Sequence, residues 1–224
     1  IRQNRRTVLC HNFGFACLAF AAYGSSAWIP TFFIRTYGWS ASDVGVLYGS
    51  VVAVAGSIGI IAGGRLSDLL HRRGYRDAPL RVGIISAALT LPLNLAYLAG
   101  TGELALALIA LHVFTIAMPF GVGPAAIQEI MPNSMRGQAS AVYLFVITMV
   151  GLGIGPTAVA LGTDFVFGDD NALRYSLLIV TGIALVGAMI LLGMGLKHYR
   201  GSLDRLQEWK PQSAAGSDAQ PKPV

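Results

Sequence analysis

The chain has 224 residues, of which 54% are hydrophobic and only 12% are charged, and its net charge is +5. Soluble domains carry roughly a quarter charged residues, so this chain lacks the polar surface that a protein surrounded by water needs. The composition therefore excludes an ordinary soluble domain.

Six apolar runs of about 20 residues are each long enough to cross the ~30 Å core of a bilayer as a helix. They cover residues 8–31, 43–63, 82–100, 104–127, 139–162 and 173–196. A spanning strand needs only about 10 residues and must alternate. We expect an all-α membrane protein: a basic cytoplasmic lead-in over 1–7, a six-helix bundle over 8–200, and a polar cytoplasmic tail over 201–224 whose composition favours disorder.

The basic residues indicate which way the helices face. If the N-terminus is cytoplasmic and the helices alternate, all but Arg35 and Arg174 of the 16 basic residues lie in cytoplasmic segments. This is the positive-inside bias. A nucleic-acid surface would gather its basic residues with aromatic side chains on one face, whereas these recur only between apolar runs. We expect an integral protein of the bacterial inner (plasma) membrane, with both ends of this segment cytoplasmic, lipids as neighbours and no nucleic-acid partner.

Polar side chains follow one face of the first and fourth apolar runs. Asn12 and Tyr23 fall on one helical face of the first run, and His112 and Thr115 share a face of the fourth. His112 lies roughly 12 Å deep, and an ionisable side chain at that depth is a functional candidate. These four residues are the candidates for lining a substrate cavity. Two alternatives remain open: Asn12 bonding a neighbouring helix, and a neutral His112 packed against a neighbouring hydroxyl.

Prolines and glycines in the apolar runs predict kinks or breaks, which membrane helices tolerate where they line a cavity. The candidate positions are Gly24 and Pro30 in the first run, Pro119, Gly121 and Pro124 in the fourth, and Gly155 and Pro156 in the fifth.

The chain also contains an internal repeat, here called the internal echo. Residues 48–68 and 143–164 both begin at a tyrosine, pass through spaced glycines and end in an aspartate near a helix end. Asp68 and Asp164 fall on opposite sides of the membrane in the predicted topology. Two three-helix units of opposite orientation are the inverted-repeat signature of secondary transporters.

A short polar stretch, residues 64–73, separates the second and third apolar runs and predicts a tight loop there. Its residues resemble the loop signature of the major facilitator superfamily: Gly64, Asp68, Arg72 and Arg73 match, whereas Leu69 and His71 depart from it. Residues 132–137 after the fourth run and 151–156 in the fifth add to the resemblance. It implies helices seven to twelve, the C-terminal half of a twelve-helix transporter, so the partner would be a missing N-terminal six-helix half.

A finer resemblance is to the Spinster-like branch. It rests on residues 27–31, Arg35, Gly45, residues 63–68 and the stretch from Gly155 to Asp164. It implies a small organic or amphiphilic solute, such as a lysophospholipid or a sphingoid lipid, with proton coupling left open. Anion:cation symporters and sugar-phosphate carriers share several of these motifs and are the alternative.

The family resemblance also implies a mechanism of alternating access, in which the first and fourth helices line the cavity. Residues 64–73 would then act as a conformational latch: Asp68 would accept hydrogen bonds from a helix N-terminus, and Arg72 and Arg73 would pair with Glu129. The proposed latch set is Gly64, Asp68, Arg72, Arg73, Glu129 and Arg136. A proton would be carried by His112 or by an acid in the missing half.

Two non-transport interpretations remain, a receptor or scaffold and an intramembrane enzyme. The sequence contains no His-Glu-x-x-His motif and no credible nucleophile–base set, so we expect neither an enzyme nor a metal or cofactor. Solute flux through the complete protein would exclude the scaffold.

Overall fold

The computed structural model of the chain describes residues 4–217, with side chains as far as Leu206. Within this part the chain forms six helical spans that are long and apolar enough to cross a membrane, and it contains no strand. Each span covers one of the six predicted apolar runs, so the predicted all-α membrane architecture is confirmed.

Several spans are built from more than one helical segment. The first span is α1 (Arg5–Tyr37), and the second consists of α2 (Ala41–Val51), a π-helical segment (Val52–Gly56) and α3 (Ser57–Arg72). The third is α4 (Ala78–Leu93) with a 3-10 turn (Asn94–Leu98), and the fourth is α5 (Gly102–Ala117) followed by α6 (Pro119–Glu129). The fifth consists of a 3-10 turn (Asn133–Met135), α7 (Arg136–Ile147), a π-helical segment (Thr148–Ile154), α8 (Gly155–Leu161) and another π-helical segment (Gly162–Phe167), and the sixth is a 3-10 turn (Asp170–Ala172) with α9 (Leu173–Ser217).

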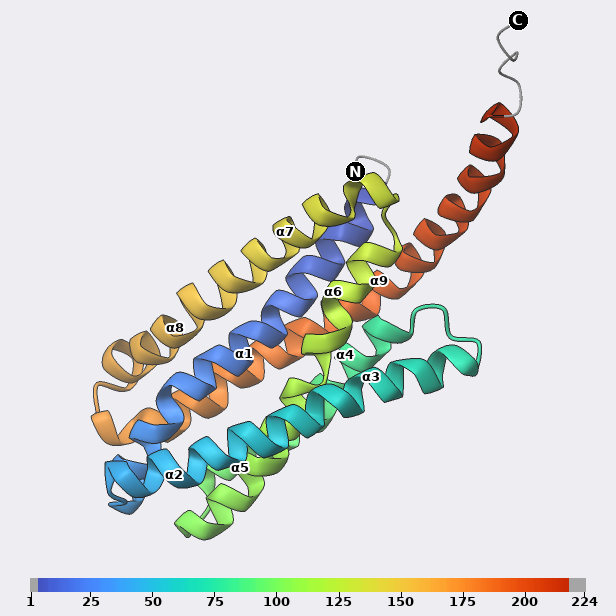
Figure 1. The fold of residues 1–224 in the computed structure, drawn as a ribbon. Helices are drawn as coiled ribbons and strands as arrows, with labels where there is room; N and C mark the ends of the chain where they lie inside the picture. Colours follow the sequence, from blue (N-terminus) through green and yellow to red (C-terminus); the bar gives the residue numbers. More distant parts are fainter. Residues whose placement is uncertain (1–3, 218–224) are drawn as a thin grey trace, which may run out of the picture.

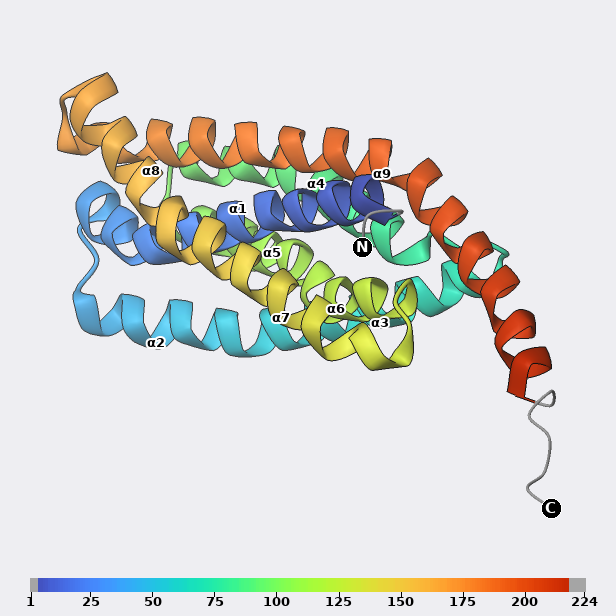
Figure 2. The same ribbon diagram turned by 90° about the horizontal axis from the view of Figure 1, so that it is seen from above.

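The first span is the centre of the bundle. Figure 1 shows α1 between α7 and α8 on one side and α9 on the other, and α4 packs between α9 and α5. Short connections make successive spans antiparallel. As a result, four segments meet at one end of the bundle, here called the basic end. They are the start of α1, the end of α3, the end of α6 and the residues of α9 near Arg200. In Figure 2, α9 runs past the start of α1 and continues beyond the bundle at this end.

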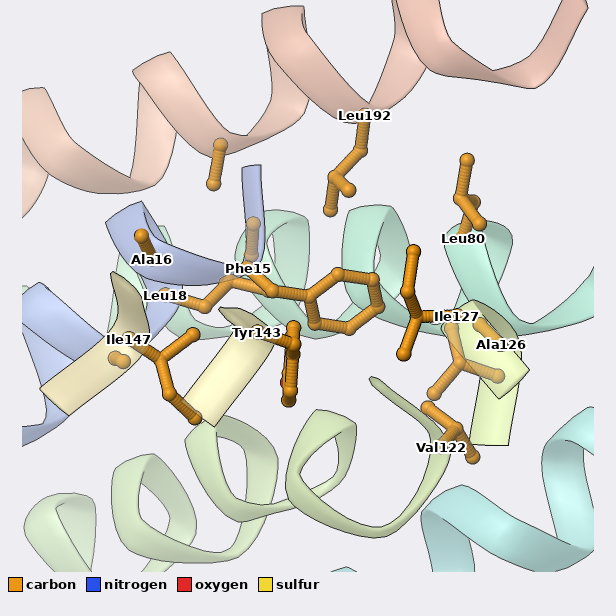
Figure 3. Packing of buried hydrophobic residues seen from close by; sticks show 14 of the residues in the cluster. Phe15, Ala16, Leu18, Leu80, Val122, Ala126, Ile127, Tyr143, Ile147 and Leu192 are labelled. Carbon is orange, nitrogen blue, oxygen red and sulfur yellow. The ribbon is translucent and has the colours of Figure 1, made fainter. Parts of the chain in front are cut away.

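The main buried core joins most of the helices (Figure 3). Side chains interlock from α1, α4, α6, α7 and α9, including Phe15, Leu18, Leu80, Val122, Ile127, Tyr143, Ile147 and Leu192. The rings of Phe15 and Tyr143 meet edge to face with centroids 6.2 Å apart. Lipid tails are as apolar as these side chains, so tight packing rather than the hydrophobic effect holds such helices together.

The predicted breaks in the first run are wrong, because α1 is a single helix through Gly24 and Pro30. A proline inside a helix frees few backbone groups, and membrane helices tolerate it where those groups find other partners. Gly24 serves a different purpose. A Cβ atom there would lie 3.2 Å from the carbonyl oxygen of Gly155, so this glycine lets α1 and α8 approach closely.

The fourth span divides at one of its three candidate positions. Helix α5 ends at Ala117 and α6 starts at Pro119, which occupies the first turn, where its missing N–H costs nothing. Gly121 and Pro124, by contrast, lie inside the continuous helix α6, so the expectation of an irregular backbone there is wrong. In the fifth span, Gly155 begins α8 directly after a π-helical segment and Pro156 follows in its first turn.

The stretch predicted to be a loop is mostly helical. Helix α3 continues to Arg72, and the reversal is made by residues 73–77 with Gly74 at φ +89°. Leu66 and Leu70 pack against the core, and leucine and arginine are strong helix formers. The charged residues therefore extend the helix instead of interrupting it.

The expected disordered tail is also corrected, because α9 remains helical to Ser217. Tyr199 and Leu203 belong to the buried core, and the hydroxyl of Ser202 lies 2.7 Å from that of Thr7. These contacts continue the packing of α9 on α1 past residue 201. The predicted tail residues 218–224, like lead-in residues 1–3, lie outside the described part of the chain.

The internal echo reappears in the backbone. The second span of each three-span unit contains a π-helical segment, at Val52–Gly56 and at Thr148–Ile154, and each begins four or five residues after the tyrosine that opens the echo, Tyr48 or Tyr143. π-helical turns inside α-helices are rare and are frequently found at functional sites. Their matched placement agrees with two repeated units.

Candidate functional site

A cavity of about 290 Å³ opens between α1, the second span and the junction of α5 with α6. Two of the four predicted cavity residues, Tyr23 and His112, line it. Its wall is otherwise made of small, apolar and hydroxyl-bearing side chains, among them Ser25, Ser26, Ile29, Tyr48, Ser57, Ile60, Val113 and Phe120. None of the described lining side chains is an aspartate, glutamate, lysine or arginine. Such a wall suits an apolar or amphiphilic ligand with a few hydrogen-bonding groups.

His112 is the most distinctive group in this cavity. Its side chain is only 1% exposed, and its Nε2 atom has no hydrogen-bond partner among the described residues. Its ring lies edge-on to that of Tyr97, whose buried hydroxyl is also unpaired. Buried polar atoms nearly always have a partner, so an unpaired imidazole nitrogen in a cavity wall marks a place where a ligand can hydrogen-bond.

Tyr23 is placed by contacts on both sides. Its ring meets that of Phe120 edge to face, with centroids 5.9 Å apart. Behind it, Gly151 leaves room for the ring, since a Cβ there would lie 2.8 Å from a ring carbon of Tyr23. The aromatic pair joins α1 to α6 across one side of the cavity.

The other two predicted cavity residues lie elsewhere. Thr115 faces α4, where it accepts a hydrogen bond of 2.8 Å from the hydroxyl of Thr90. Ser86 donates to the backbone carbonyl of the same threonine at 2.7 Å. Thr115 therefore joins α5 to α4. A buried hydroxyl requires a hydrogen-bond partner, and Thr90 of α4 provides one.

Asn12 lines a separate apolar cavity of about 190 Å³ between α1, α6 and α7. Its Oδ1 atom lies 3.1 Å from Nδ1 of His11. It thus belongs to the contact region nearer the basic end and does not share the cavity of Tyr23, although both lie on one helical face.

His11 is a buried polar residue that sequence reasoning missed. It is fully buried, with Nε2 3.0 Å from the carbonyl oxygen of Gly123, and its ring packs 5.2 Å from that of Tyr143. The sequence signal that could have revealed it is a histidine beside an asparagine within an apolar run. The contacts of His11 join α1 to α6 and α7.

The predicted latch residues do not form one cluster within this chain. Asp68, Arg72 and Arg73 are exposed at the end of α3 and its turn, and none forms an ion pair with a described side chain. Glu129 instead accepts a hydrogen bond of 2.8 Å from the hydroxyl of Tyr199. The pairing of Glu129 with Arg72 and Arg73 is therefore wrong for this structure, in which its carboxylate is hydrogen-bonded by Tyr199 of α9.

Gly64 and Arg136 complete the latch set. Around Gly64 there is open space, with no atom within 4 Å of an added Cβ, and Arg136 is an exposed residue that reaches only the carbonyl of Met131 at 3.5 Å. The face carrying Gly64 and Asp68 is thus accessible to something outside this chain.

A charge cluster at the basic end was also missed. Asp77 is 1% exposed, and its carboxylate contacts Arg81 at 2.7 Å and Arg200 at 3.1 Å. Asp77 lies in a short polar connection between two apolar runs, and nothing in the sequence of this connection indicates that the side chain is buried. The return of α9 over this connection brings Arg200 to it and covers it.

The fold, six apolar spans with a cavity between the first, second and fourth of them, defines a polytopic helical membrane protein. A family model described as Major Facilitator Superfamily matches residues 5–156. The chain therefore belongs to the major facilitator superfamily, a family of membrane transporters.

Two relatives show where the chain lies within this family. It is 31% identical over 179 residues to an MFS-type efflux pump of Mycolicibacterium smegmatis, covering 79% of this chain and 42% of that protein. It is 25% identical over 213 residues to protein spinster homolog 1 of Xenopus tropicalis, covering 82% and 39%. The chain thus spans less than half the length of these relatives and resembles Spinster-type members.

Solved structures agree on the fold. A bacterial homologue of the human lysosomal transporter Spinster, in an inward-facing and occupied conformation, superposes with a TM-score of 0.63 at 18% identity over 88% of this chain and 49% of that one. Its inward-facing, unoccupied form gives 0.63 at 17% identity over 91% and 50%. This chain therefore has the fold of half of such a structure.

Proposed function

We propose that the chain is the C-terminal six-helix half of a secondary active transporter that moves a small organic or amphiphilic solute across the bacterial inner membrane by alternating access. The observation that carries the proposal is the cavity of about 290 Å³ with an unpaired His112 nitrogen in an otherwise uncharged wall. In this mechanism the two halves rock about a site near the middle of the membrane.

The nature of the wall also supports the class of solute. A sugar phosphate or another anion would need a cationic side chain to replace its hydration, and the described lining of this half contains none. An amphiphile, by contrast, can pack its chain against Ile29, Ile60 and Val113 and place its polar group near His112. The similarity to an efflux pump and to Spinster-type proteins supports this choice over an anion symporter.

His112 has two roles in the proposal. Its Nε2 atom hydrogen-bonds the polar part of the solute, and its ring can take up a proton in one conformation and release it in the other. Proton coupling would then require no carboxylate in the described spans; the buried acid Asp77 lies in the connection before α4 and is held by two arginines.

The proposal is tested by reconstituting the complete protein in liposomes and measuring flux of a fluorescent lysophospholipid. His112→Ala should lower the flux about tenfold, the effect of one hydrogen bond lost in an apolar cavity, while expression stays unchanged. Leu111→Ala is the matched control, because this neighbour on α5 is 54% exposed on the outer face. Liposomes containing only this six-helix chain should show no flux.

His112→Gln separates the two roles, because glutamine keeps a hydrogen bond but does not titrate. A variant with normal binding and no dependence on a proton gradient supports the coupling role. Equal flux in His112→Ala and the wild type would refute the site, and no flux of any amphiphile by the complete protein would favour a receptor or scaffold.

A further inference from the structure

A third cavity, of about 350 Å³, lies at the basic end between α1 and α9. Figures 1 and 2 show the first turn of α1 lying beside α9 there. This cavity is separate from the cavity of His112 and is strongly basic. Side chains from two ends of the sequence converge on it: Arg5, Arg6, Thr7, Lys197, His198 and Arg205.

The positive charges in this cavity are not neutralised within the described part of the chain. Arg5, Arg6, Lys197 and Arg205 form no ion pair with a described acidic side chain. Some neighbouring basic residues at the same end are neutralised: Arg76 pairs with Asp204, and Arg81 and Arg200 pair with Asp77. Others, such as Arg72 and Arg73, are also without an ion pair among the described residues but do not line this cavity. The cavity is therefore the place where several unpaired basic side chains gather in one concave site.

The floor of the cavity is held by hydrogen bonds between its two helices. Thr7 donates to the carbonyl oxygen of His198 at 2.9 Å, and its hydroxyl lies 2.7 Å from that of Ser202. Arg205 donates to the side chain of Asn4 at 2.8 Å. These contacts keep α1 and α9 at a set spacing, so the helix positions that carry the basic groups are already brought together.

An apolar surface continues from the basic cavity toward the middle of the bundle. On α1, Leu9 and Phe13 follow Arg5 at intervals of four residues and are 53% and 47% exposed. On α9, Ile190 and Met194 precede Lys197 on the same helical face and are 56% and 59% exposed. The site is therefore cationic at the end of the bundle and apolar directly beside it.

We propose that this cavity binds the phosphate head group of an anionic phospholipid at the bilayer surface. The acyl chains lie along Leu9 and Phe13 of α1 and Ile190 and Met194 of α9. Guanidinium and ammonium groups form charge-assisted hydrogen bonds with phosphate oxygens, and basic cavities between membrane helices suit anionic head groups. A soluble phosphate would use the charges but leave the apolar surface without a role.

Lipid binding to the purified complete protein, measured by native mass spectrometry, tests the proposal. Cardiolipin and phosphatidylglycerol should bind more tightly than phosphatidylcholine. Arg6→Gln/Lys197→Gln should weaken the binding of the anionic lipids about 30-fold, the loss expected for two basic groups at an anionic surface. Neither side chain makes a hydrogen bond or an ion pair with a described residue, so the variant should fold normally.

The matched control is Arg65→Gln/Arg73→Gln, which removes two charges from the same end outside the cavity without breaking a described ion pair and should leave lipid binding within about twofold. Equal losses in both double variants would overturn the proposal in favour of a general surface charge. So would equal affinity for phosphatidylcholine. Displacement of the lipid by an equal concentration of inorganic phosphate would indicate a small-anion site instead and would also overturn it.

Discussion

Asp77 is the buried acidic side chain of the described chain, and its position shows how a single residue can organise one end of a membrane bundle. It lies just before α4, pairs with Arg81 one turn later and with Arg200 of α9. Arg81 also lies over the ring of Tyr75 at 4.2 Å. A carboxylate removed from water needs such partners, so this residue ties the third span to the sixth.

Replacing Asp77 with asparagine should destabilise the complete protein by about 1–3 kcal/mol, because two arginines lose their partner and an uncharged amide cannot replace it. Both arginines are partly exposed, which limits the loss. The measurement is the midpoint of thermal unfolding in detergent. Asp204→Asn, which breaks only the exposed pair with Arg76, should cost less than about 1 kcal/mol. Equal losses in the two variants would contradict a structural role for Asp77.

Helices in this bundle approach through glycines, and the second span depends most on them. A Cβ atom on Gly59 would collide with the carbonyl oxygen of Phe114, and one on Gly63 with that of Met118. These glycines are four residues apart and lie on one face of α3. That spacing lets α3 contact the backbone of α5 and of the turn that leads into α6.

Gly63→Ala should therefore separate α3 from the start of α6 and reduce the yield of folded protein severalfold. The adjacent Gly64→Ala is the control, because its Cβ meets no atom within 4 Å. It should be neutral or slightly stabilising, since alanine is favoured over glycine in a helix by about 0.5–1 kcal/mol. Yield and unfolding temperature in detergent report both effects, and equal behaviour of the two variants would contradict the packing model.

At the scale of the whole molecule, the second and fifth spans are the least buried of the six. They expose large apolar side chains such as Val54 and Ile61 on the second span and Phe145 and Met149 on the fifth. The chain also covers only about half of its solved structural neighbours. These two faces are where we place the contact with the other half of the proposed transporter.

The latch remains a proposal at this scale, since Asp68 is exposed beside the open space at Gly64. If Asp68 contacts the other half only when the basic end is closed, Asp68→Asn should shift the population toward opening at that end. The shift should reach about fivefold at most, as expected for an exposed charged contact. Labelling of Ser57→Cys in the cavity by an impermeant maleimide from each side measures it. Unchanged labelling, or an equal shift in Asp204→Asn, would refute the latch.

Some features of this fold follow from local sequence, and others do not. Membrane helices must satisfy their own backbone hydrogen bonds, so run lengths were sufficient to predict all six spans, and local spacing placed Tyr23 and His112 on cavity faces. Predictions from composition were wrong where the same residue type is found in two different structural settings. Gly24 indicated a break but allows close packing, and the polar residues 64–72 indicated a loop but extend α3.

What the sequence by itself determined is therefore the class of protein, the number of spans and the repeated units, because each follows from local composition or spacing. Only the tertiary structure decided which polar groups meet. It turned Thr115 toward α4, joined Asp77 to Arg200 and Thr7 to Ser202, and left His112 unpaired in the cavity. Those outcomes depend on which helix lies opposite each side chain, and residues on different helices carry no local pattern that specifies it.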